Sequence, residues 1–404
     1  MNRDVRIEMP YEAEWIIKKI RERGFEAFAV GGCVRDTLLG RTPGDWDITT
    51  SAKPEEVKAI FGKTVDTGLQ HIKNRKGYEV TTYRIDGEYR DGRHPDSVEF
   101  TSSLLEDLKR RDFTINAMAY SHETGIVDAF DGMGDLEKKV IRCVGCPRDR
   151  FTEDALRILR AIRFAAQLGF SIEGETYGAI REIAPNLKNV SKERIQVELT
   201  KLLTSAHPEK IAMVEDTGIS PYVTGDFPLV FQTERERMAG GTSGPEPFSC
   251  LALLPPEKSM RWAGFLRHME PDMVRRILKG LKLDNETVDN GKAMAGAAQA
   301  PLGPEKPGIR RFLSRMTPYQ FDGCLRLKAL DKDPQTEEIR RLWEEIEKDG
   351  DCVSLKELAV GGGDLLAAGM EGKEIGETLR RLLDLVLEDP SLNRRELLLE
   401  KLLG

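Results

Sequence analysis

Hydrophobic and polar positions follow two different rhythms along this chain. In the first 145 residues, helical and strand patterns take turns: an amphipathic helix is predicted over 11–22 and a short apolar strand over 25–30. Residues 45–50 and 78–84 are rich in β-branched side chains and predict further strands, and a helix is expected to begin near Ser103. This part is therefore expected to fold as a small α+β domain with a mixed sheet.

After residue 145 the strand patterns almost disappear and a period of 3.6 residues takes over. The clearest helical stretches cover 152–168, 175–183, 191–203 and 364–403. Two stretches rich in Gly and Pro, 240–247 and 300–307, resemble linkers. We therefore expect the mixed head to be followed by an all-helical remainder.

Composition limits the class of protein. With 404 residues the chain is too long for one compact core, so two to four domains are expected. No apolar stretch follows the charges at the N-terminus, and none approaches the roughly 18 residues that span a bilayer, so a cytoplasmic protein without membrane contact is expected. Six irregularly spaced cysteines predict reduced thiols; the pair Cys143 and Cys146 lacks the second pair that a metal site needs.

The net charge of −7 argues mildly against a nucleic-acid partner, because binding phosphates requires positive charge. Local charge matters more than the total, however. Between residues 148 and 163 there are five arginines against three acidic residues. This basic stripe is a candidate nucleic-acid footprint within an acidic protein.

The strongest chemical constellation begins at Gly31 and Gly32, which follow a predicted strand and precede a predicted helix. Two glycines there let the backbone approach a ligand closely, with free N–H groups aimed at a triphosphate. Asp45 and Asp47 follow, and alternation along a strand places them on the same face. Two adjacent carboxylates repel each other unless a cation neutralises them, and their oxygens suit Mg²⁺. The competing interpretation is a solvated turn between two strands.

Residues 31–50 resemble the signature of the DNA polymerase β-like nucleotidyltransferases, specifically the bacterial tRNA CCA-adding and poly(A) polymerase family. The resemblance continues through 110–117, 128–142, 153–157 and 191–199; it is close over 25–205 and looser beyond. It implies four domains: a catalytic head (1–145), a neck that recognises the nucleotide base (146–207), an RNA-binding body (208–300) and a tRNA-binding tail (301–404).

The resemblance also implies an activity: addition of CCA to the 3′ end of tRNA from CTP and ATP, with Mg²⁺ as cofactor. Asp45 and Asp47 would be the catalytic, metal-binding residues. The implied nucleotide-binding residues are Gly31, Gly32, Arg35, Arg111, Asp112, Asn116, Asp154, Arg157, Arg160 and Arg163. Within the family, Asp112 and Asn116 would face the ribose 2′-hydroxyl and select NTP over dNTP, and Arg111 would hold phosphate or ribose.

Asp154 and Arg157 are the most informative pair for base selection. At positions i and i+3 of a predicted helix they project side by side, so an intrahelical salt bridge is the ordinary interpretation. Cytosine and adenine, however, both present an amino donor beside a ring-nitrogen acceptor. Asp154 can accept from the amino group while Arg157 donates to the nitrogen; guanine and uracil reverse this order. The family assigns the same role to these positions.

A polar loop over 85–96 is expected to move and so change the specificity of the pocket from cytosine to adenine. Gly87 and Gly92 give its backbone the freedom to do so. The charged side chains by which this loop would contact the site residues are Asp86, Glu88, Arg90, Asp91 and Arg93. The presence of this loop argues against an enzyme that adds only CC, because CC-adding members of the family lack the loop. Two interpretations of Glu79 stay open: a third acidic residue near the metal, or a solvated strand residue. They stay open because the basic segment 72–76, which precedes this strand, departs from the family pattern.

Three alternatives stay open at the level of sequence. An enzyme that adds only A and a poly(A) polymerase belong to the same class, although the acidic C-terminal half lacks the basic extension typical of the polymerases. A catalytically inactive RNA-binding protein is the alternative from a different class. The joint presence of Asp45, Asp47, Asp112, Asp154 and Arg157 speaks against it.

Overall fold

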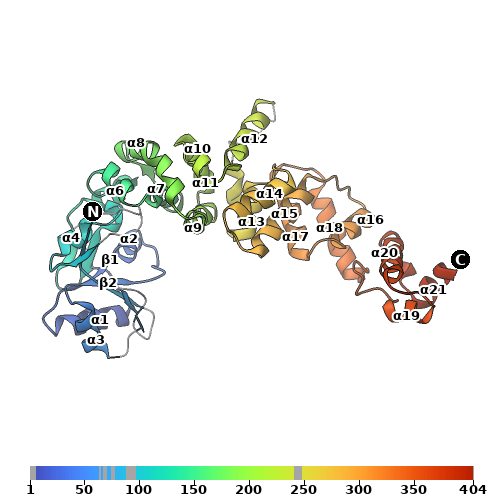
Figure 1. Cartoon of the computed structure of the whole chain (residues 1–404), viewed down its shortest axis with the longest axis horizontal. Helices are drawn as coiled ribbons and strands as arrows, with labels where there is room; N and C mark the ends of the chain where they lie inside the picture. Colours follow the sequence, from blue (N-terminus) through green and yellow to red (C-terminus); the bar gives the residue numbers. More distant parts are fainter. Residues whose placement is uncertain are drawn as a thin grey trace. The chain divides into compact units, whose positions relative to one another are not determined.

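A computed structural model describes residues 6–62, 65–66, 71–73, 78–87, 97–240 and 248–403 of the chain. The chain divides into two compact units, Met1–Phe231 and Gln232–Gly404. The seven-stranded sheet belongs to the first unit, and Figure 1 shows only helices labelled from α12 onward. In the described ranges, no helix is both long enough and apolar enough to cross a membrane.

A seven-stranded mixed sheet forms the centre of unit 1. Its strands, in spatial order, are β3 (Val65–Asp66), β4 (His71–Lys73), β5 (Glu79–Thr82), β2 (Asp47–Thr50), β1 (Ala27–Val30), β8 (Met118–Ser121) and β9 (Gly125–Asp128). β2 runs antiparallel to β1 and parallel to β5. Two further pairs are β6 (Arg84–Asp86) with β7 (Val98–Phe100) and β10 (Val140–Ile141) with β11 (Ser171–Ile172).

The helices of unit 1 flank this sheet or follow it along the chain. They are α1 (Tyr11–Arg21), α2 (Gly32–Leu38), α3 (Pro54–Phe61), α4 (Leu104–Lys109), α5 (Gly132–Lys138), α6 (Pro147–Glu153), α7 (Leu156–Leu168), α8 (Gly174–Ile183), α9 (Lys192–Leu203), α10 (Ala212–Asp216) and α11 (Ser220–Val223). The core under the sheet contains Phe28 and Val30 of β1 together with Tyr83 and Leu108. The predicted α+β head with a mixed sheet is confirmed.

Two predicted elements of unit 1 differ from the structure. The strand expected over 45–50 begins at Asp47, so Asp45 precedes it. The single helix expected over 152–168 is broken between α6 and α7, because Asp154 has an extended backbone (φ −145°, ψ 101°). The Asp154 carboxylate accepts the N–H of Leu156 at 3.1 Å and so satisfies a donor at the start of α7.

The regular elements described in unit 2 are all helices, and α12 (Phe227–Ala239) continues into it from unit 1. The helices that follow are α13 (Lys258–Phe265), α14 (Pro271–Gly280), α15 (Asn285–Gln299), α16 (Lys306–Leu313), α17 (Pro318–Leu330), α18 (Thr336–Asp349), α19 (Gly362–Ala367), α20 (Lys373–Glu388) and α21 (Arg395–Leu403). α15 packs against α13, α14 and α17. The linker predicted over 300–307 is wrong, because Leu302 is buried in a core with Phe321 and α16 begins at Lys306.

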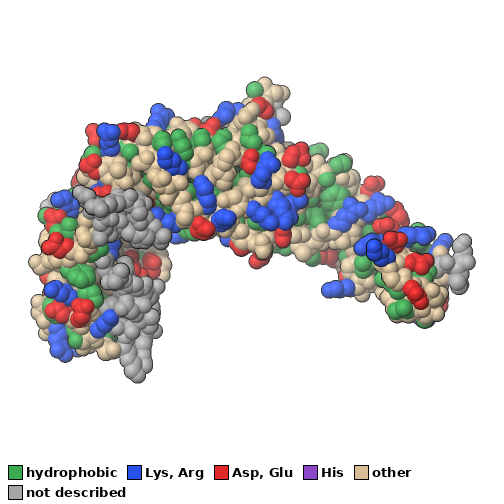
Figure 2. All heavy atoms as spheres, viewed as in Figure 1, with side chains coloured by type: hydrophobic (Ala, Val, Ile, Leu, Met, Phe, Trp, Pro, Cys, Tyr) green, Lys and Arg blue, Asp and Glu red, His purple; other side chains and the backbone are tan. Residues whose placement is uncertain are grey.

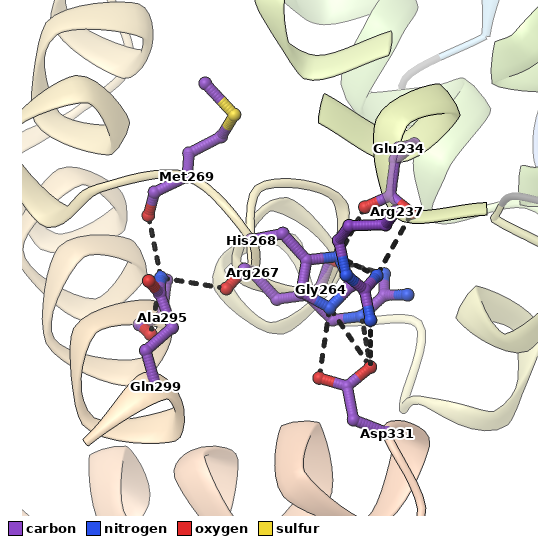
Figure 3. Close-up of polar contacts among 9 residues, drawn as sticks. All are labelled: Glu234, Arg237, Gly264, Arg267, His268, Met269, Ala295, Gln299 and Asp331. Carbon is purple, nitrogen blue, oxygen red and sulfur yellow. Dashed lines mark hydrogen bonds and ion pairs between the residues drawn. The ribbon is translucent and has the colours of Figure 1, made fainter. Parts of the chain in front are cut away.

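A cluster of charged side chains ties several of these helices together (Figure 3). His268, in the turn after α13, contacts Glu234 of α12 through Nδ1 and Asp331 after α17 through Nε2 at 3.1 Å. The Glu234 side chain is 6% exposed and that of His268 is 11% exposed. Burial alone would raise the pKa of Glu234, but the hydrogen bond and charge of His268 lower it.

Candidate active site

All the nucleotide-binding residues expected from the sequence line a single cavity of about 520 Å³ in unit 1. Its volume lies within the range of small-molecule sites. The lining comprises Gly31, Gly32, Arg35, Asp45, Asp47, Arg110, Arg111, Asp112, Asn116, Asp154, Leu156, Arg157, Arg160, Arg163, Phe164 and Arg194. Seven of these sixteen residues are arginine and four are aspartate. The cavity is therefore suited to a polyanion such as a triphosphate, with carboxylates left to hold a cation.

Gly31 provides the close turn that joins β1 to α2. Its φ is +82°, and a Cβ there would lie 3.1 Å from Nη1 of Arg111. Because other residues rarely adopt this backbone and the space is filled, only glycine fits without strain. The expectation of free N–H groups is wrong at Gly31, whose N–H donates to the carbonyl of Met118 at 3.0 Å.

Arg35 lies one turn into α2 and is held firmly on the cavity wall. Its Nη1 donates to Oδ1 of Asn116 at 2.7 Å, and its Nε and Nη2 each donate to Asp36 at 2.9 Å. Arg35 and Asn116, both predicted from the sequence as nucleotide-binding residues, therefore lie in one site and contact each other.

Asp45 and Asp47 both reach the cavity, on either side of Trp46, which is 8% exposed and points into the core. This burial pattern matches the predicted alternation, although only Asp47 belongs to β2. Glu79 is paired with Asp47 in the parallel register of β2 and β5, yet it does not line the cavity. Among the described residues, no group of three His, Cys, Asp or Glu side chains could hold a metal ion.

Asp112 is a buried carboxylate, 8% exposed, with partners on both oxygens. Oδ2 accepts from Nε and Nη2 of Arg160 at 2.8 and 2.6 Å, and Oδ1 accepts from Asn116 at 3.2 Å. Burial alone would raise the pKa of Asp112, but the adjacent Arg160 lowers it to about 2. The carboxylate is therefore ionised at neutral pH and fixes Arg160 in the wall.

Behind Arg110 and Arg111 lies Asp107, a fully buried residue that the sequence reasoning missed. Asp107 accepts from Nε and Nη2 of Arg110 at 2.9 and 2.7 Å and from Nη2 of Arg111 at 3.3 Å. Nε of Arg111 is buried without a hydrogen-bond partner. The i, i+3 and i, i+4 spacing of Asp107, Arg110 and Arg111 could have predicted these contacts, because such residues are neighbours on a helix.

Asp154 and Arg157 do not form the intrahelical salt bridge that their spacing suggested. Asp154 follows α6 and accepts from Nη2 of Arg194 at 2.7 Å, and Arg157 donates to Glu153 at 2.6 Å through Nη1. Each member of the pair therefore has its own charged partner. Arg194 on α9 was not among the predicted site residues; it lies inside the segment 191–199 that the family resemblance covers.

Arg163 packs against Phe164, another cavity residue that the sequence reasoning missed. The guanidinium of Arg163 lies 3.8 Å from the ring centroid, and those of Arg35 and Arg160 lie 5.1 and 5.5 Å from it. Nε of Arg163 donates to Glu198 of α9 at 2.5 Å. The aromatic ring and the buried carboxylate together hold the arginines of the wall in place.

The charged residues of the predicted flexible loop cannot be compared with the structure. Glu88, Arg90, Asp91 and Arg93 lie outside the described residues, and so does the side chain of Asp86. Gly87 is described, and a Cβ there would lie 2.5 Å from Oγ of Ser97. Its lack of a side chain thus permits close backbone approach to Ser97.

Comparison with known proteins agrees with this geometry. Family models match at residues 27–142 ("Poly A polymerase head domain"), 169–227 ("Probable RNA and SrmB- binding site of polymerase A") and 255–402 ("tRNA nucleotidyltransferase domain 2 putative"). The chain is 37% identical over 392 residues to the CCA-adding enzyme of Geobacillus kaustophilus, covering 93% of this chain and 92% of that protein.

Two further relatives support the same assignment. The CCA-adding enzyme of Leuconostoc mesenteroides is 54% identical over 197 residues, which is 48% of this chain and 49% of that protein. The crystal structure of the Bacillus stearothermophilus CCA-adding enzyme with CTP superimposes with a TM-score of 0.81 at 32% identity, covering 98% of both chains. The chain therefore belongs to the family of CCA-adding enzymes, which are tRNA nucleotidyltransferases.

Proposed function

We propose that the chain adds CCA to the 3′ end of tRNA, without a nucleic-acid template, using CTP and ATP and releasing pyrophosphate. The observation that carries this proposal is the cavity of unit 1, where seven arginines surround four aspartates beside the Gly31 turn. Such a lining can hold a nucleoside triphosphate by its phosphates while carboxylates remain for a cation and for the base. The cytoplasmic location expected from the sequence stays a prediction.

Nucleotidyltransferases of this family use a divalent metal ion, and Asp45 and Asp47 would hold it. Mg²⁺ is the ion that we propose, because it favours hard oxygen ligands and commonly binds one or two carboxylates together with substrate phosphates. When bound, the ion would lower the pKa of the attacking 3′-hydroxyl and stabilise the leaving pyrophosphate. Phosphate oxygens and water would complete its coordination.

The remaining residues position the substrate. The arginines of the wall bind the triphosphate, and the Asp112–Arg160 and Arg35–Asn116 contacts keep that wall rigid at the side proposed to face the ribose. Pre-organised charges of this kind cost no reorganisation when the 3′-oxygen attacks the α-phosphorus and pyrophosphate leaves. Arg111 is proposed to contact phosphate or ribose.

Base selection is assigned to Asp154 and Arg157. Arg194 and the N–H of Leu156 each use one lone pair of the Asp154 carboxylate, and each carboxylate oxygen has a second lone pair for an amino group. Glu153 holds the Arg157 guanidinium at 2.6 Å, which fixes its orientation toward a ring nitrogen. One bidentate contact of this type is worth about 1–3 kcal/mol of discrimination.

The proposal is tested by incubating the purified protein with tRNA that lacks its terminal nucleotides, Mg²⁺ and one labelled NTP at a time. CTP and ATP should be incorporated in the order that the tRNA end demands, and GTP and UTP should not. Asp47→Ala should abolish incorporation while tRNA binding survives. Incorporation within tenfold of wild type in Asp47→Ala would contradict the assignment of the metal site, and no incorporation by wild type would favour an inactive RNA-binding protein.

A further inference from the structure

Asp107 of α4 carries a charge that has no access to solvent. Figure 2 shows charged side chains of both signs interspersed over the surface, where water and salt screen them. Asp107, by contrast, is 0% exposed and does not itself line the cavity. Burial alone would raise the pKa of Asp107, but the charges of Arg110 and Arg111 lower it. The carboxylate is therefore ionised at neutral pH and depends on protein donors.

Both oxygens of the Asp107 carboxylate accept hydrogen bonds. Oδ1 accepts from Nε and Nη2 of Arg110 at 2.9 and 2.7 Å. Oδ2 accepts from Nη2 of Arg111 at 3.3 Å and from Oγ1 of Thr49 at 3.1 Å. A carboxylate offers about four lone-pair sites, so these contacts occupy it fully. Asp107 therefore joins two arginines of the cavity wall to one residue of the sheet.

Thr49 connects Asp107 with the strand that leads to the proposed metal site. Thr49 is fully buried in β2 and follows Asp47 by two residues. Residues two apart in a strand point to the same face of the sheet. Thr49 therefore contacts Asp107 on the face of β2 from which Asp47 reaches the cavity. One carboxylate thus links the strand of Asp47 with the two arginines.

The two arginines that Asp107 holds both line the cavity. The side chains of Arg110 and Arg111 are 18% and 19% exposed, so part of each is open to a ligand. Nη1 of Arg111 also lies against the Gly31 turn, where a Cβ would approach it to 3.1 Å. The carbonyl of Arg110 accepts from Nη2 of Arg157 at 3.5 Å. The protein itself therefore sets the positions of both arginines.

We propose that Asp107 is a positioning residue for nucleotide transfer, which holds Arg110 and Arg111 at a fixed place relative to Asp47. This inference rests on the proposed function. An arginine that rotates freely still attracts a triphosphate, because the attraction between opposite charges depends on their distance. Stabilising the charge that develops on the leaving pyrophosphate requires donors that are already in place. Loss of Asp107 therefore acts on the rate of the chemical step rather than on nucleotide affinity.

Two other roles of Asp107 lead to different outcomes. If the carboxylate only balanced the charge of the wall, its removal would tighten CTP binding and leave kcat unchanged. If it only stabilised the fold, its removal would lower the urea concentration of unfolding and leave the kcat of the folded protein unchanged. A positioning role lowers kcat and leaves the Kd for CTP nearly unchanged.

The test uses Asp107→Asn, which keeps the shape of the side chain and removes its charge. The matched control is Asp351→Asn in unit 2, which removes another carboxylate from an ion pair with arginine. Asp351 accepts from Nη1 of Arg310 at 2.8 Å, and the two side chains are 11% and 5% exposed. The kcat for adding C is measured at saturating CTP with saturating tRNA that lacks CCA. The Kd for CTP is measured without tRNA, and urea unfolding shows that each variant folds.

Asp107→Asn should add C about 10–100-fold more slowly than wild type, because misplaced groups lose transition-state stabilisation. Its Kd for CTP should stay within about threefold of wild type. The kcat of Asp351→Asn should stay within about twofold of wild type, since its ion pair lies in the other unit. Thr49→Val removes only the hydroxyl that joins β2 to Asp107 and should slow C addition about three- to tenfold.

Three results would overturn the inference: an unchanged kcat in Asp107→Asn, an equal loss of kcat in Asp351→Asn, or a loss of CTP affinity that accounts for the whole loss of kcat/KM. If Asp107→Asn does not fold, an unchanged kcat in Thr49→Val overturns it. Absence of nucleotide addition by the wild-type protein would contradict the proposed function and this inference with it. An active wild type with an equally active Asp107→Asn contradicts the inference alone, so the two failures are distinguishable.

Discussion

Replacing Arg160 by methionine is expected to destabilise unit 1 by leaving a buried carboxylate without its cation. Two nitrogens of Arg160 donate to the same oxygen of Asp112, at 2.8 and 2.6 Å. Asp112 is 8% exposed, so its carboxylate depends mainly on protein donors. Methionine keeps most of the length of the side chain while removing the guanidinium.

The size of the effect follows from the pKa of Asp112. Burial alone would raise it, but Arg160, with smaller contributions from Arg157 and Asn116, lowers it from 3.8 to about 2. At about 1.4 kcal/mol for each tenfold change, this gap corresponds to about 2.5 kcal/mol that stabilises the folded state. Breaking a buried ion pair by removing one partner costs about 3–5 kcal/mol. We therefore expect the Arg160→Met variant to lose about 3 kcal/mol at pH 7.

The sign of the pH dependence provides a second readout. Because the folded pKa lies below the unfolded one, the stabilisation is present above about pH 4 and is lost as the pH falls toward 2. Wild type should therefore lose this contribution on acidification, whereas Arg160→Met should not.

The assay is urea unfolding followed by circular dichroism at pH 7, 5 and 3. Arg148→Met is the control, because Arg148 is 67% exposed in its pair with Glu182 and its loss should cost less than about 0.5 kcal/mol. If Arg160→Met unfolds at the same urea concentration as Arg148→Met, the carboxylate is not held by Arg160 and the reasoning is refuted.

Three further predictions concern selectivity, stability and the order of addition. Asp154→Ala should admit G and U, measured with each labelled NTP; strict C and A selectivity at lower activity would make this residue structural. His268→Phe should cost about 2 kcal/mol in urea unfolding, because Glu234 is buried beside it, and an unchanged midpoint would contradict this. Replacing residues 87–95 with a Gly/Ser linker should leave C addition largely intact and stop before the terminal A on a gel; near-normal A addition would place the switch elsewhere.

The positions of most site residues were predicted from the resemblance to the nucleotidyltransferase family, whose motifs are short and local in the chain. The Gly31 turn and the alternation around Trp46 depend on neighbours in the chain, so they need no tertiary information. The α+β class follows from the strand patterns over 25–30, 45–50 and 78–84, although β8 and β9 of the same sheet were not predicted. The four-domain division and the roles assigned to the site residues stay predictions.

The partners of those residues could not be predicted, because they come from distant parts of the chain. Arg194 lies 40 residues after Asp154, and Arg160 lies 48 residues after Asp112. The break at Asp154 was missed because the apolar period continues through it, although an aspartate can cap the following helix. The linker prediction at 300–307 failed because Pro307 lies in the first turn of α16, where proline is favoured.

We propose that the cavity of unit 1 adds two C residues and then one A to tRNA. This proposal is tested most directly by extending a tRNA that lacks CCA with CTP alone, and with CTP and ATP together, and reading product length on a sequencing gel. Two added residues are expected with CTP alone and three with both nucleotides. Extension only of a tRNA that already ends in CC would identify an A-adding enzyme, and a long A tract would identify a poly(A) polymerase; either result would contradict addition of CCA by this cavity.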